Sequence, residues 1–89
     1  MAKLVFTQQL RRFIAVPEVD TTAGTLRAAL EEAFTISPQL RGYILDEQGH
    51  LRQHVTIFID GLRIRDRVTL GEPLASASQI HVLQALSGG

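Results

Sequence analysis

The residues best placed to do chemistry in this chain are its last two, Gly88 and Gly89. A free α-carboxyl group has a pKa of roughly 3.5, so a terminal Gly89 would be ionised at neutral pH, and we expect it to be the reactive group. Glycine has no Cβ, so this end can enter a channel that a larger residue would block. Ala85, Leu86 and Ser87 lengthen it into an arm that a partner would order. The alternative is that Gly88 and Gly89 are a frayed end with no function.

Composition limits the other function classes. The 89 residues predict one small domain, and nine basic side chains balance nine acidic ones. This neutral balance gives no electrostatic signature for nucleic acid or for a membrane surface. The absence of cysteine excludes disulfides, thiolate metal sites and cysteine nucleophiles. The first seven residues lack the features of a signal peptide, and no apolar run approaches a membrane span, so we expect a cytoplasmic protein.

The N-terminal part predicts two strands. Residues 4–6 form a short β-type run, and residues 13–16 form a second one that Pro17 ends. Residues 8–12 would then be a hairpin connection. Residues 20–25 are a polar break that contains candidate helix caps, with Thr25 or Thr22 favoured.

One amphipathic helix follows the polar break. Arg27 and Glu31 lie off its apolar stripe at a spacing that favours an ion pair. Ser37 and Pro38 are expected to end the helix. The apolar residues recur at helical spacing, and they are Leu26, Ala29, Leu30, Ala33 and Phe34.

The C-terminal half predicts three more strands. Residues 55–59 are rich in β-branched side chains, and Asp60-Gly61 after them is a strong hairpin signal. Residues 62–65 would return, and residues 80–85 would form the last strand after a turn at 76–78. Residues 40–54, which contain the turn signal Glu47-Gln48-Gly49, are expected to be hairpin-like. One helix against these strands predicts an α+β two-layer domain.

This order resembles the ubiquitin-like β-grasp sulfur carriers, which include the molybdopterin synthase small subunit and the carriers of thiamine and cysteine synthesis. The resemblance is carried by Gly24-Thr25-Leu26 before the helix, by residues 55–61 and by residues 80–89. Many members have an acidic turn where this chain has Ser76-Ala77-Ser78, and a proline where it has Gln84. The added segment 36–54 makes the chain more similar to the molybdopterin-type and cysteine-type carriers.

The resemblance implies a β-grasp fold with a mixed four- to five-stranded sheet on one main helix. It divides the chain into a β-grasp domain, residues 1–85, and a flexible tail, residues 86–89. It also implies a carrier with no active site of its own, no bound cofactor and no metal.

The implied chemistry starts with a MoeB/ThiF-like adenylating enzyme, of the ubiquitin-activating type, that uses ATP to attach AMP to the carboxyl group of Gly89. Sulfur from a donor would replace AMP and leave a thiocarboxylate. A biosynthetic enzyme would accept that sulfur for cofactor, cysteine or other metabolite synthesis. Gly88 would let the tail lie extended in the narrow sites of both the adenylating enzyme and the accepting enzyme.

Strand alternation predicts a surface for these partners. If Val55, Ile57 and Ile59 face the helix, then Phe58 faces away. If Ile80 and Val82 face the helix, His81 and Leu83 also face away. An exposed apolar patch of this kind usually marks an interaction site, which the resemblance implies is the one for the activating enzyme. The alternative is that Phe58 packs under residues 40–54 as a minor core. The candidate partner-binding residues are therefore Phe58, His81, Leu83, Ala85, Leu86 and Ser87.

Other charged or titratable residues predict no further site. His50 and His54 have helical metal-ligand spacing but flank a turn. Arg63, Arg65 and Arg67 would share one face of the return strand, either to meet an acidic partner or to protect an edge. The acidic residues form no general acid–base pair.

Two other functions compete with sulfur transfer. The first is a protein modifier joined to lysines of its targets through Gly89, which fits a chain whose only lysine is Lys3. The second is a non-catalytic β-grasp binding module with an incidental tail. The sequence does not name the sulfur acceptor.

Overall fold

A computed structural model describes residues 1–7 and 18–84 of the chain, and these form one sheet and two helices. In chain order the elements are β1 (Ala2–Phe6), β2 (Glu18–Thr21), α1 (Leu26–Ile36), α2 (Pro38–Ile44), β3 (Val55–Ile59), β4 (Leu62–Arg63) and β5 (Gln79–Gln84).

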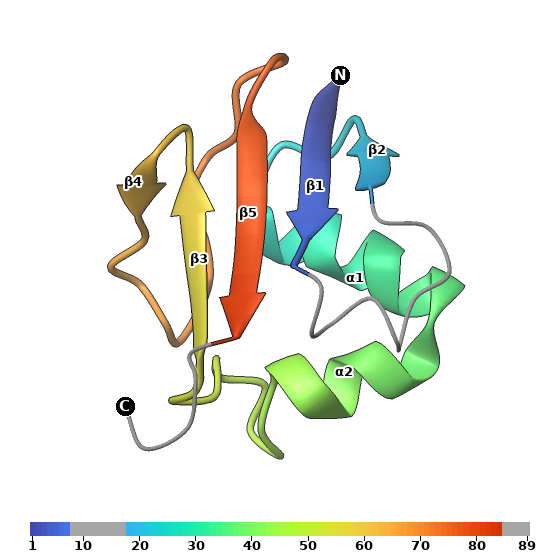
Figure 1. The fold of residues 1–89 in the computed structure, drawn as a ribbon, viewed down its shortest axis with the longest axis vertical. Coiled ribbons are helices and arrows are strands. Elements are labelled where there is room, and N and C mark those ends of the chain that lie inside the picture. Colours follow the sequence, from blue (N-terminus) through green and yellow to red (C-terminus); the bar gives the residue numbers. More distant parts are fainter. Residues whose placement is uncertain (8–17, 85–89) are drawn as a thin grey trace.

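The strands form a single mixed sheet in the order β2-β1-β5-β3-β4 (Figure 1). β1 and β5 are parallel, whereas the pairs β1–β2, β3–β5 and β3–β4 are antiparallel. The last strand therefore lies at the centre of the sheet, between the first strand and β3. The predicted mixed sheet of four to five strands is confirmed with five.

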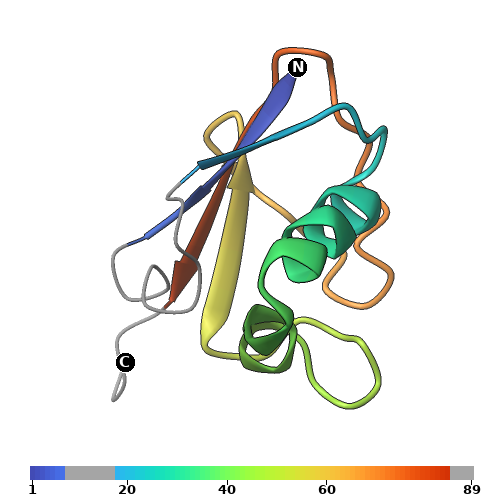
Figure 2. The ribbon, with the colours of Figure 1, turned by 90° about the vertical axis from the view of Figure 1, so that its right-hand side faces the viewer.

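Both helices pack on the same face of the sheet, so the domain has two layers (Figure 2). Alternate residues of the central strands point into the space between the layers, as the period of two requires. The α+β prediction is confirmed. The fully buried strand residues are Leu4, Phe6, Val55, Ile57, Ile80 and Val82, and they share one core cluster with the buried face of α1.

The first helix follows its sequence signals closely. Thr25 has extended backbone angles, and its Oγ1 accepts the N–H of Ala28 at 3.3 Å, so Thr25 is the N-cap. The helix ends at Ile36, before Ser37 and Pro38, as expected. The whole predicted apolar stripe is buried, namely Leu26, Ala29, Leu30, Ala33 and Phe34.

The second strand differs from the prediction. Asp20 and Thr21, assigned to a polar break, belong to β2, which pairs with β1 through contacts such as Leu4 with Val19. Val19 and Thr21 point into the core while Glu18 and Asp20 point outward. Only one of the two inward residues is apolar, and the strand is four residues long with charged outward residues. The sequence of β2 therefore shows almost none of the apolar alternation from which a strand is predicted. The predicted strand 13–16 and the connection 8–12 lie outside the described residues.

The segment after Pro38 was also predicted wrongly, because its first half is a helix rather than part of a hairpin. Pro38 occupies the first position of α2, where its missing N–H costs nothing. Leu40 and Ile44, four residues apart, are fully buried against the core. Pro38 therefore ends one helix and starts the next.

Arg27 holds two loops against the start of α1. Its Nη2 donates to the carbonyl oxygens of Gly49 at 2.7 Å and Val68 at 3.0 Å, and its Nε donates to that of Thr69 at 3.2 Å. The predicted pair of Arg27 with Glu31 is therefore wrong, and Glu31 instead pairs with Arg41. A cation in the first turn opposes the helix dipole, so these long-range bonds explain its presence there.

We expect Arg27→Met to lower the free energy of unfolding by about 1–3 kcal/mol, because it removes charge-assisted bonds to three carbonyl groups. Arg41→Met is the matched control, since it removes an exposed ion pair with Glu31 and the cation–π contact of its exposed side chain with Phe34, each worth about 1 kcal/mol or less. Urea unfolding followed by circular dichroism measures both. Equal losses of unfolding free energy in the two variants would contradict the stabilising role of the bonds from Arg27 to the two loops.

The carboxylate of Asp66 organises the loop that Arg27 holds. The hydroxyl and N–H of Thr69 both donate to it, as does the N–H of Val68. These bonds, with that from the Thr69 hydroxyl foremost, hold the pKa of Asp66 well below the usual range of aspartate.

The lowered pKa predicts a pH dependence of stability. A folded-state pKa below that of the unfolded chain, about 3.9, stabilises the fold above that pH and ceases to do so as the pH falls through the folded value. Asp66→Asn should therefore melt at a lower temperature than the wild type at neutral pH. The difference should shrink in acid below pH ~4. Melting curves between neutral and acid pH measure it, and a difference that stays constant with pH would contradict the assignment.

Candidate functional site

The predicted reactive tail follows the central strand directly. β5 ends at Gln84. Ala85, Leu86, Ser87, Gly88 and Gly89 lie outside the described residues, so their roles stay predictions. The part of the candidate site that the structure describes is the sheet face opposite the helices, here called the open face.

The open face brings the three predicted patch residues together. Phe58 on β3 lies directly opposite His81 on β5, and Leu83 lies two residues further along β5, opposite Thr56. His81 is exposed, while Phe58 and Leu83 are half-buried. Because α2 covers the other face of the sheet, the alternative in which Phe58 packs under residues 40–54 is wrong. Whether the patch binds a partner stays a prediction.

The register extends this patch into a row across all five strands. Arg63, Phe58, His81, Val5 and Glu18 are successive cross-strand partners from β4 to β2. Sequence reasoning missed Val5, Arg63 and Glu18, because their place beside the patch depends on strand order. The row has a cation at one end, an anion at the other, and the apolar side chains of Phe58 and Val5 on either side of His81 between them.

This arrangement suits protein binding rather than catalysis. Apolar side chains inside a polar rim are the usual anatomy of an interface, and opposite charges at the two ends would fix the orientation of a partner. Lys3 on the same face pairs with Glu18 at 3.2 Å. Residues 1–7 and 18–84 contain no group of three metal-ligating side chains, and the ring of His54 instead meets Tyr43 edge-on at 5.3 Å.

The hairpin at Asp60-Gly61 fixes the edge of the open face. Both residues have positive φ, 52° and 85°, as a two-residue hairpin turn requires. The N–H of Asp60 donates to the carbonyl of Gln79 at 2.8 Å, and its Oδ1 accepts the N–H of Gln79 at 2.9 Å. The turn is thereby joined to the start of β5.

The return strand is shorter than predicted, and its arginines separate. β4 ends at Arg63 rather than at residue 65. Arg67 turns inward, where its Nη2 donates to the carbonyl oxygens of Arg52 at 2.6 Å and Val55 at 2.8 Å. The expected single face of Arg63, Arg65 and Arg67 is therefore wrong, and only the first two are exposed.

Comparison with solved structures identifies this topology. The small archaeal modifier protein 1 of Methanosarcina acetivorans superimposes with a TM-score of 0.81 over 99% of this chain and 95% of its own, at 26% identity. The fold is the ubiquitin-like β-grasp. SAMP1 of Haloferax volcanii has a TM-score of 0.84 at 20% identity, over 99% of this chain and 98% of its own. CysO in the BexX/CysO complex of Amycolatopsis orientalis has a TM-score of 0.86 at 13% identity, over the full length of both chains.

These neighbours are ubiquitin-like β-grasp sulfur carriers and modifiers, small proteins that are not themselves enzymes. The resemblance inferred from the residues is confirmed at the level of the β-grasp fold. No protein-family model and no curated protein sequence matches the chain. Within the described part of this β-grasp chain, neither helix is long and apolar enough to cross a membrane.

Proposed function

We propose that this β-grasp protein is a sulfur carrier whose Gly89 carboxyl group becomes a thiocarboxylate. The observation that carries the proposal is a β-grasp match that extends over nearly the whole length of carrier and modifier proteins. In this chain only three residues separate the end of the central strand from Gly88-Gly89. The protein acts as a substrate of its partners and supplies docking and reach.

The proposed reaction has two steps. A carboxylate oxygen of Gly89 attacks the α-phosphorus of ATP in an adenylating partner, which releases pyrophosphate and leaves an acyl-adenylate. Hydrosulfide released by a sulfur donor then attacks the carbonyl carbon, AMP leaves with the electron pair of the broken C–O bond, and the thioacid that forms loses its proton. The product is a thiocarboxylate whose sulfur a biosynthetic enzyme can accept.

The open face is the proposed docking surface for the adenylating partner. Phe58, His81 and Leu83 lie on β3 and β5, and β5 is the strand that continues into the tail. A partner seated there would have the tail within reach of its own active site.

Intact-mass measurement tests the proposal. The protein is produced together with the adenylating enzyme of its own organism, purified without reductant and weighed. The expected product ends at Gly89 and has one oxygen replaced by sulfur. An unmodified terminus, with the enzyme active on ATP, would overturn the proposal.

A second candidate is a protein modifier, which the similarity to two small archaeal modifier proteins favours. A lysine amine of a target would attack the same acyl-adenylate and form an amide as AMP leaves. Blotting of cell lysate for higher-mass conjugates distinguishes it from sulfur transfer.

A further inference from the structure

The outer edge of β4 presents backbone groups that face away from the sheet. The N–H of Ile64 donates to the carbonyl of Ile57 at 3.0 Å, and Phe58–Arg63 is the neighbouring pair of the ladder. Antiparallel pairs alternate between hydrogen-bonded and non-hydrogen-bonded, so the N–H and C=O of Arg63 point outward. β4 is the last strand of the described sheet on this side. An extended segment can therefore pair with it.

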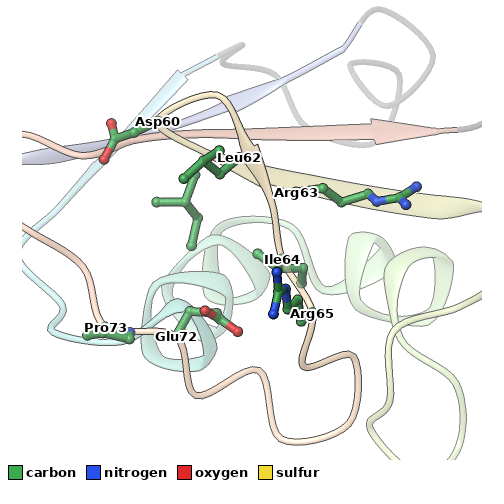
Figure 3. Close-up of a pocket in the computed structure, with 8 residues that line it drawn as sticks. Asp60, Leu62, Arg63, Ile64, Arg65, Glu72 and Pro73 are labelled. Atoms are coloured by element: carbon green, nitrogen blue, oxygen red, sulfur yellow. The ribbon is translucent and has the colours of Figure 1, made fainter.

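A hollow of about 560 Å³ lies beside this edge, on the helix side of the sheet (Figure 3). Leu62 and Ile64 lie on one side of it, and Pro73 faces them from the segment that precedes β5. Leu62 is 75% exposed and borders this hollow. A partner's apolar side chain in this hollow would cover it.

Two guanidinium groups beside the edge have no acidic partner. Among the described residues, no carboxylate lies within ion-pair distance of Arg63 or Arg65, and both are exposed. The nearest acidic group of the hairpin, Asp60, is engaged with the N–H of Gln79. Glu72 also lines the hollow, and its Oε1 accepts the N–H of Asp66 at 3.4 Å, so neither acidic residue of the lining forms an ion pair with the two guanidinium groups.

We propose that the β4 edge binds an extended segment of a partner protein in which acidic and apolar residues alternate. The segment adds a sixth strand through the outward backbone groups of Arg63. Since successive side chains of a strand point to opposite faces, one apolar side chain enters the hollow while its neighbours place carboxylates near Arg63. Arg65, which lines the hollow, adds positive charge at its rim. This surface goes beyond the proposed function, because it needs neither the Gly89 carboxyl group nor the Phe58 patch.

Titration of the full chain with synthetic peptides tests the proposal. The probe is a capped hexapeptide of alternating aspartate and valine, and its control has lysine in place of aspartate. In ¹⁵N-labelled protein, the amides of Arg63 and Arg65 should shift with the acidic peptide, and exchange of the Arg63 amide hydrogen should slow by at least ~10-fold. The lysine peptide should cause neither change. A probe with N-methylated central residues should lose binding, because it keeps the side chains but not the backbone donors.

Matched variants separate this edge from general charge attraction. Arg65→Glu should weaken binding of the acidic peptide by at least ~10-fold, whereas Arg41→Glu, the same charge change on α2, should leave it within about twofold. Equal effects of the two variants would overturn the proposal. So would equal binding of the lysine or N-methylated peptides, or shifts confined to Phe58 and His81. If an oligouridylate bound more tightly than the acidic peptide at the same amides, the edge would be an RNA site and the proposal would be overturned. If these amides shifted with protein concentration in the absence of peptide, the edge would instead bind a second copy of the chain, which would also overturn it.

Discussion

A variant with one alanine added after Gly89 is expected to show no oxygen-to-sulfur exchange, while its folded domain stays unchanged. The added residue replaces the carboxyl group that the proposed chemistry requires with an amide and moves the free carboxyl onto a residue with a Cβ. Alanine at the end also narrows the range of backbone angles that the tail can adopt in a tight channel. Intact mass after production with the adenylating enzyme measures the exchange.

The matched control is a protein with one alanine added before Met1. Its exchange should equal that of the wild type, since only the N-terminus has changed. The melting temperatures of both variants should match the wild type, because neither addition alters a core residue. Undiminished exchange in the variant extended after Gly89 would show that the reactive group lies elsewhere.

The second large effect is expected at the open face. Phe58→Asp should reduce the rate of adenylation by at least ~10-fold, because it places a charge in the centre of the proposed docking patch. The fold should survive, since Phe58 is half-buried on the face opposite the core and its cross-strand partner His81 is exposed. ATP–pyrophosphate exchange catalysed by the adenylating enzyme measures the rate.

Ile36→Asp is the control for this variant. Ile36 is 55% exposed at the end of α1, on the helix side of the sheet, so the same kind of substitution is made away from the patch. It should leave adenylation within about twofold of the wild type. Equal losses of adenylation rate in the two variants would show that the open face is not the docking surface for the adenylating enzyme. The variant extended after Gly89 would still test the role of the tail, because that test does not depend on where the partner docks.

The central strands could be predicted from the sequence because their side chains alternate cleanly. Val55 and Ile57, like Ile80 and Val82, are fully buried, and the residues between them face outward as expected. This alternation was enough to assign Phe58, His81 and Leu83 to one face. It was not enough to place Val5 and Arg63 in the same row, since neighbours across a sheet are set by strand order.

All the errors except the one on α2 share a physical cause, which is stabilisation by distant parts of the chain. β2 has one apolar inward residue, Val19, and exists because β1 supplies its hydrogen bonds. Leu70 is fully buried at a positive φ of 54° in an irregular loop, where no periodicity marks it. Arg27 bonds to carbonyl groups more than twenty residues away. For α2, by contrast, a local signal existed in Pro38 followed by Leu40 and Ile44.

The central position of β5 has a consequence for synthesis on the ribosome. Without residues 79–84, the described sheet falls into two separate hairpins, β1–β2 and β3–β4, because β5 is the strand that both of them pair with. A nascent chain thus cannot complete this domain until residues 79–84 have been synthesised. Partners that recognise the assembled sheet would consequently not bind a chain whose synthesis stopped before residue 79.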